Sequence, residues 1–172
     1  MYLKVILCAC IIAFSLKVSS FAAMKSKKDA DTLRAMAHEF MLFKDGIVIK
    51  NLSVKEMSNE VTSQNKAVKA FFDSSFTLMC KYPEMPLNNV FNTSVNTLEL
   101  SKDAKRQLID ELNYISSLFD RHNTEIFLQG INNSCARLIE LSDSVMDKYK
   151  RDSFLYKRVG ILFGMIICMF IF

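Results

Sequence analysis

The scarcity of turn-forming residues is what most constrains the fold of this chain. Only 4 glycines and 2 prolines occur among 172 residues, whereas an antiparallel sheet needs such residues at every turn. Long helices need far fewer of them. The sequence therefore predicts an all-α protein, and at this length a single domain can bury a core without cross-links.

The N-terminus, residues 1–22, has the features of a secretory signal peptide. Lys4 precedes an apolar run from Val5 to Leu16, and a more polar stretch with small residues follows. Ser20 and Ala22 occupy the two positions that a signal peptidase reads, so cleavage is expected after Ala22. The apolar run is shorter than the roughly 20 residues of a membrane-spanning helix. An N-terminal anchor is the alternative interpretation.

The C-terminus, residues 157–172, is predicted to be a membrane segment. A soluble core helix needs a polar face, and from residue 159 onward this run has none. About 14 residues extend only about 21 Å, against about 30 Å of hydrocarbon, so a span would require Lys157 and Arg158 to reach toward the headgroups. The apolar residues of the segment are Val159, Gly160, Ile161, Leu162, Phe163, Gly164, Met165, Ile166, Ile167, Cys168, Met169, Phe170, Ile171 and Phe172.

Basic residues beside both apolar ends oppose export of the body, because positive flanks normally stay in the cytoplasm. Lys25, Lys27 and Lys28 follow the first apolar run, and another basic group at 148–158 precedes the tail. A cleaved signal with a short C-terminal anchor, which leaves the body on the extracytoplasmic side, is the leading prediction. Exchange of the tail for a glycolipid anchor near residues 142–144 is a second arrangement. A cytoplasmic body with embedded ends is the third, and it satisfies every basic flank.

Between the ends, residues 23–156 are predicted to form an antiparallel bundle of about four helices. The first helix runs from about Asp29 to Phe43, with Gly46 as a left-handed stop just beyond it. The second opens with Ser53 and Glu56, the pair of a capping box, and ends before Pro83. Its apolar seam has heptad spacing: Val54, Met57, Val61, Gln64, Val68, Phe71, Ser75 and Leu78.

The second half of the body is expected to contain one loop and two helices. Residues 88–100 are polar and predict the loop. Ser101 caps a third helix, whose apolar stripe is Ala104, Leu108, Leu112, Ile115 and Phe119. Asn123 caps a fourth helix, whose stripe is Phe127, Ile131, Ser134, Leu138, Leu141, Val145 and Tyr149. No breaker separates this helix from the tail, so it can continue into the membrane with a joint near Asp152.

Two cysteines, Cys80 and Cys135, are the only thiols of the body. In an oxidising compartment a disulfide could join the second helix to the fourth, closing a loop of about 55 residues and adding about 4 kcal/mol of stability. Two buried thiols that never meet are the alternative.

Two asparagines, Asn92 and Asn51, are candidate glycosylation sites because each begins an Asn-X-Ser/Thr triplet. Asn92 is the stronger candidate because it lies in the predicted loop. Asn132 begins a third triplet but falls inside a helix, where a glycan would have to face outward.

No catalytic residue, metal ligand or cofactor site is predicted. His38 and Glu39 begin like a zinc-protease motif, but Leu42 stands where the second histidine would be. His122 is expected at a polar helix junction. Without residues 1–22 the chain has 20 basic and 18 acidic residues, whereas a nucleic-acid-binding domain is usually strongly basic.

The sequence therefore predicts a non-enzymatic, membrane-anchored helical protein whose body contacts another protein, as a surface ligand or as a subunit of a membrane assembly. Membrane lipid and a second protein are the expected partners, and no nucleic acid is expected. A binder of a small apolar ligand and a membrane-perturbing protein are the alternatives.

Overall fold

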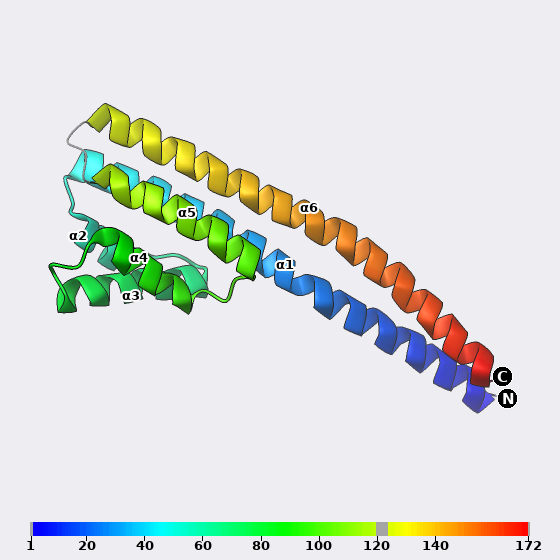
Figure 1. Ribbon diagram of the computed structural model, residues 1–172. Coiled ribbons are helices and arrows are strands. Elements are labelled where there is room, and N and C mark those ends of the chain that lie inside the picture. The colour runs from blue at the N-terminus through cyan, green and yellow to red at the C-terminus, as the bar shows by residue number, and fades with distance from the viewer. Residues whose placement is uncertain (1, 120–123, 172) are drawn as a thin grey trace. The chain divides into compact units, whose positions relative to one another are not determined.

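The computed structural model describes residues 2–119 and 124–171, with side chains described at Lys17, at 24–156 outside the gap, at 158–162, at 166 and at 169. Helices account for almost all of this part of the chain, and no strand occurs in it, so the all-α prediction is confirmed (Figure 1). There are six α-helices in the described residues rather than about four. They are α1 (Tyr2–Lys50), α2 (Val54–Glu60), α3 (Lys66–Lys81), α4 (Leu87–Ser94), α5 (Lys102–Phe119) and α6 (Thr124–Ile171), with a 3₁₀ turn, η1 (Val95–Thr97), after α4.

The chain divides into two compact units. Residues 29–143 form the body, and residues 1–28 together with 144–172 form the terminal unit. Helices α1 and α6 each contribute to both units. The predicted boundaries after residues 22 and 156 are untested and remain predictions.

Helix α1 is longer at both ends than the predicted helix 29–43. Asp29 was expected at a helix start but lies inside α1, and Gly46 is helical rather than a left-handed stop. The left-handed residue is Asn51, with φ 54°, and asparagine tolerates this conformation better than most residues. The Leu52 N–H donates to the Gly46 carbonyl at 3.3 Å, and this bond closes the turn that follows α1.

The predicted second helix is divided into α2 and α3. Its capping box is confirmed, because the Ser53 side chain accepts from the Glu56 N–H while the Glu56 carboxylate accepts from the Ser53 N–H. The continuous seam through Val61 and Gln64 is wrong. Val61 has extended backbone, and Asn65 starts a new helix by accepting from the N–H groups of residues 67 and 68.

The predicted loop at residues 88–100 is also wrong, because it contains α4 and η1. Pro86 precedes α4, where its missing N–H costs nothing. Val90, Phe91 and Ser94 are buried, and their spacing of one, three and four residues is that of a helix face. The polar residues between them concealed this periodicity.

The third and fourth predicted helices correspond to α5 and to the first part of α6. Ser101 lies at the expected start of α5, where its carbonyl accepts the first helical bond from Lys105. Figure 1 shows α5 and α6 as neighbours that run in opposite directions. Arg137 on α6 donates to both carboxylate oxygens of Glu111 on α5, at 2.7 and 2.9 Å. Helix α6 has no joint at Asp152, and Asn123 lies outside the described residues.

Phenylalanine rings from three helices form the centre of the body's core. Phe40 and Phe43 from α1, Phe71 and Phe72 from α3, and Phe91 from α4 are at most 1% exposed. Their ring centroids lie 4.9 to 6.1 Å apart, the distance range of favourable aromatic pairs. Four of the five apolar residues predicted for α5, from Ala104 to Ile115, are also buried, and the fifth, Phe119, is half-buried.

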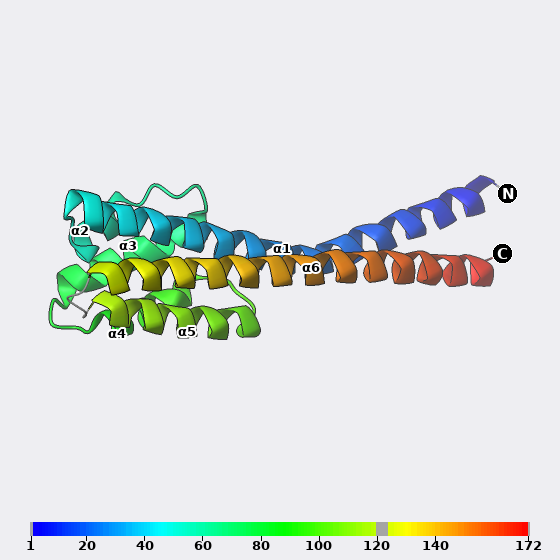
Figure 2. The ribbon, with the colours of Figure 1, turned by 90° about the horizontal axis from the view of Figure 1, so that it is seen from above.

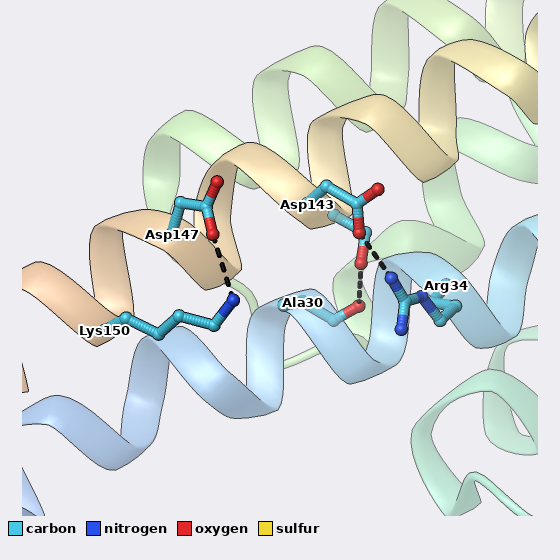
Figure 3. A network of polar contacts seen from close by, with 6 residues as sticks. Ala30, Arg34, Asp143, Asp147 and Lys150 are labelled. Carbon is cyan, nitrogen blue, oxygen red and sulfur yellow. Dashed lines mark hydrogen bonds and ion pairs between the residues drawn. The ribbon is translucent and has the colours of Figure 1, made fainter.

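Polar contacts tie α1 to α5 and α6 at one end of the body, and Figure 3 shows those between α1 and α6. The Ser142 hydroxyl donates to the Ala30 carbonyl at 2.9 Å in a buried position, and Arg34 pairs with Asp143 on the surface. Asp29, which is 2% exposed, accepts from the Ser101 N–H at 3.1 Å. A carboxylate inside α1 therefore satisfies a backbone donor at the start of α5.

Among the residues that the structure describes, no helix has an apolar stretch long enough to cross a membrane.

Candidate interaction groove

A groove of about 280 Å³ lies between the last turns of α1 and helix α2. Its lining residues are Glu39, Leu42, Phe43, Asp45, Gly46, Ile49, Lys50, Met57, Glu60, Val61 and Thr62. Figure 2 shows the neighbouring ends of these two helices from above. Two apolar lining residues remain open to solvent, Leu42 at 45% and Ile49 at 75% exposed.

The turn between α1 and α2 builds this groove. The left-handed Asn51 ends α1, and the capping box at Ser53 and Glu56 starts α2 only three residues later. Hydrogen bonds from the Ser53 backbone and hydroxyl lower the pKa of Glu56, so this carboxylate stays charged and continues to hold the cap. The chain therefore reverses sharply, and α2 returns along α1.

Close helix packing at Gly46 seals the bottom of the groove. A Cβ atom at Gly46 would stand 2.1 Å from the sulfur of Met57, which is far inside van der Waals contact. Only glycine therefore lets Met57 pack this deeply. Met57 is 7% exposed, and its flexible thioether suits an irregular surface.

Acidic residues predominate among the charged groups of the groove. Glu39, Asp45 and Glu60 line it together with a single cation, Lys50. Asp45 contacts Lys44 at 3.6 Å. Glu39 is only 5% exposed, and no hydrogen bond or ion pair reaches its carboxylate from the part of the chain that the structure describes.

The sequence motifs indicate Glu39 only as half of an incomplete zinc motif and do not predict that it lines a groove. A usable signal was present, because Glu39 lies on the face of α1 that carries Met36 and Phe43, at spacings of three and four residues. An acid at such a position is buried among apolar side chains or faces a partner.

The two cysteines of the body are free, so the structure does not support the disulfide. Cys80 is exposed near the end of α3, whereas Cys135 is buried in α6. Burial raises the pKa of Cys135 to about 11, with Glu111 adding to the rise and Lys44 opposing it. This thiol is therefore protonated and inert at neutral pH.

The glycosylation sites stay predictions, and one of the candidates occupies different surroundings from those expected. Asn92 lies on α4 rather than in a loop, and its amide donates to Asn113 at 2.9 Å. Asn51 is exposed at the end of α1. Asn132, on α6, accepts from Lys44 at 3.1 Å.

His38, the histidine that the structure describes, belongs to no metal-binding cluster of described residues. His38 is exposed on α1, and His122 lies outside the described residues. Within the described ranges no cluster of three or more His, Cys, Asp or Glu could hold a metal ion.

The predicted membrane segment forms the last part of α6, and Phe172 lies outside the described residues. The large apolar side chains described in this segment are exposed, from 41% at Ile161 to 78% at Met169. The three residues 154–156 just before it are exposed as well, at 46 to 54%. Arg158 lies over the Phe154 ring at 4.0 Å, so a cation covers part of this apolar surface.

Together these features define the class of the protein: an all-α protein with a helical body that carries an acidic, apolar groove. The chain belongs to the family of stage III sporulation protein AB, whose family model matches residues 4–172. The match covers both apolar ends as well as the body. No curated protein and no solved structure matches the chain.

Proposed function

We propose that this chain is a non-enzymatic subunit of a membrane-associated protein assembly that acts in sporulation, held by both ends with its body on the cytoplasmic side. Membership in the stage III sporulation protein AB family supports a role in sporulation. The remaining support comes from how charge and apolar surface are distributed along the chain.

The separation of charge between the two units carries the proposal. The terminal unit contains ten Lys and Arg against two Asp and Glu, a formal charge of +8. The body contains twelve basic and sixteen acidic residues, a formal charge of −4. Each basic residue near an anionic leaflet contributes about 1 kcal/mol of attraction, whereas the body is repelled.

The positions of these cations favour the cytoplasmic side over the extracytoplasmic one. Lys25, Lys27 and Lys28 stand between the first apolar run and the body, and Lys148, Lys150 and Arg151 stand between the body and the tail. Positive residues on the body side of both ends retain the body in the cytoplasm.

Continuity of α1 supports an N-terminal anchor rather than a cleaved signal. The helix runs from Tyr2 to Lys50 without interruption, so cleavage after Ala22 would cut a helix that continues into the body. An uncut α1 attaches the first apolar run directly to the core that contains Phe40 and Phe43.

Surface apolar residues support a protein partner. Leu42, Ile49, Tyr82, Tyr114 and Ile126 are 39 to 75% exposed on the body, and large apolar and aromatic side chains are typical centres of protein interfaces. Lipid is the expected contact of the exposed apolar residues at the end of α6.

Protease accessibility tests the proposal in sporulating cells. The full-length chain should fractionate with membranes, and the body should be degraded in inverted membrane vesicles but protected in spheroplasts. Intact-mass measurement should find residues 1–22 still attached. A chain that is freely soluble, or a body that is cleaved from outside intact spheroplasts, would contradict the proposal.

A further inference from the structure

Glu39, a nearly buried residue whose carboxylate has no protein partner among the described residues, is the feature of the groove that most needs an explanation. Removing a charged group from water is costly unless a counter-charge or several hydrogen bonds replace the water. Glu39 is 5% exposed, lines the groove and receives neither kind of contact from the described residues. Its carboxylate oxygens are not among the fully buried atoms without a partner, so they face the open groove. They are therefore available to a cation that enters the groove.

The other lining residues indicate which chemical groups a ligand should carry next to that cation. Leu42 and Ile49 present exposed apolar surface in the same groove as Glu39, and the flexible, nearly buried Met57 also lines it. The volume of about 280 Å³ is at the low end for small-molecule sites, which occupy about 300 to 1,000 Å³. It suits one or two anchoring side chains of a peptide segment.

Charge selects among the chemical classes that could enter. The groove has a net charge of −2 from Glu39, Asp45 and Glu60 against Lys50, and the surrounding body is also acidic. Anionic lipid headgroups and acidic peptides are therefore repelled. A positively charged segment is attracted and oriented.

We propose that this groove is the docking site for a segment of a different protein, in which a lysine or arginine lies next to a large apolar side chain. The cation pairs with Glu39, and the apolar side chain contacts Leu42, Ile49 and Met57. This inference rests on the proposed function, because it assigns a place to the partner contact that the function requires.

Site-specific photocrosslinking in sporulating cells tests the inference on the full-length chain. Benzoylphenylalanine replaces Ile49 at the groove or Tyr82 at the end of α3, and crosslinked peptides are sequenced. Position 49 should capture one other protein through a peptide with a Lys or Arg within about four residues of a large apolar residue, the spacing that puts both on one helix face.

Two charge-removing variants distinguish a specific contact with Glu39 from a general effect of the body's negative charge. Glu39→Gln should lower the adduct at position 49 by about tenfold or more, because a charge-assisted bond is lost. Asp73→Asn, the same change at an exposed site on α3, should leave the yield within about twofold. If Glu39→Gln fails to fold, the crosslinker is placed at Leu42 instead. Ile49→Lys, a change at the exposed rim, should then lower the adduct because it replaces an apolar contact with a charge that repels the basic segment.

Several results would overturn the inference. These are an adduct that survives Glu39→Gln, a captured peptide without a basic residue, capture of only lipid or a second copy of this chain, and no adduct at position 49. If position 82 still captures a protein, the groove is wrong and the proposed function stands. If neither position captures any protein, both are wrong.

Discussion

Truncation of Phe72 should reveal how strongly the aromatic cluster stabilises the body. Phe72 is fully buried, and its ring lies 5.6 Å from Phe40, 5.0 Å from Phe43 and 4.9 Å from Phe71 between centroids. A buried Phe→Ala change costs about 3 to 5 kcal/mol, and each aromatic pair adds about 0.5 to 1.5 kcal/mol. We therefore expect Phe72→Ala to lose about 5 kcal/mol.

That loss is a large part of the total stability of a domain, about 5 to 15 kcal/mol. It corresponds to a fall in Tm of about 10 to 20 °C for a chain of this size. Urea unfolding of the full-length protein in detergent, followed by circular dichroism at the helix band, measures the change.

Phe154→Ala is the matched control for this measurement. Phe154 is 54% exposed, and its described ring contact is the Arg158 cation at 4.0 Å, so the same truncation should cost less than about 1 kcal/mol. If Phe72→Ala costs no more than Phe154→Ala, the rings from α1, α3 and α4 do not form the core, and the description of the body is wrong.

Three further predictions concern polar contacts and thiols. Ser142→Ala should cost about 1 kcal/mol at any salt concentration, because a buried hydrogen bond is lost. Arg34→Ala should cost less than about 1 kcal/mol, and the loss should vanish in 1 M salt, because both partners of its ion pair are more than half exposed. Urea unfolding at two salt concentrations distinguishes the two variants. At pH 8 a thiol reagent should modify Cys80 and spare Cys135, and equal rates would refute the burial of Cys135. The ordinary pKa of Cys135, 9.0, is raised to about 11 in the folded chain, so the unfolded state loses its proton first and stability falls as pH rises from 9 to 11. Unfolding measured across that range should show a flatter profile for Cys135→Ala.

The helical class and several helix ends were readable from neighbouring residues alone. Few glycines and prolines meant few turns, and the pairing of Ser53 with Glu56 marked the start of α2. The stripe predicted for α5 repeats every three or four residues, and its first four members, from Ala104 to Ile115, are buried as expected. Such features depend on contacts within one or two helical turns, which the local order of residues determines.

The tertiary structure decided the features that depend on residues far apart in the chain. Burial of Val90 and Phe91 turns a polar stretch into α4, and the break at residues 61–65 lets α3 bring Phe72 against Phe40. The groove likewise exists only because α2 returns along α1 and places Met57 against Gly46. A pattern along one helix shows which residues can be buried, but only packing between helices determines which groups each of them contacts. This packing leaves Glu39 nearly buried without a counter-charge among the described residues.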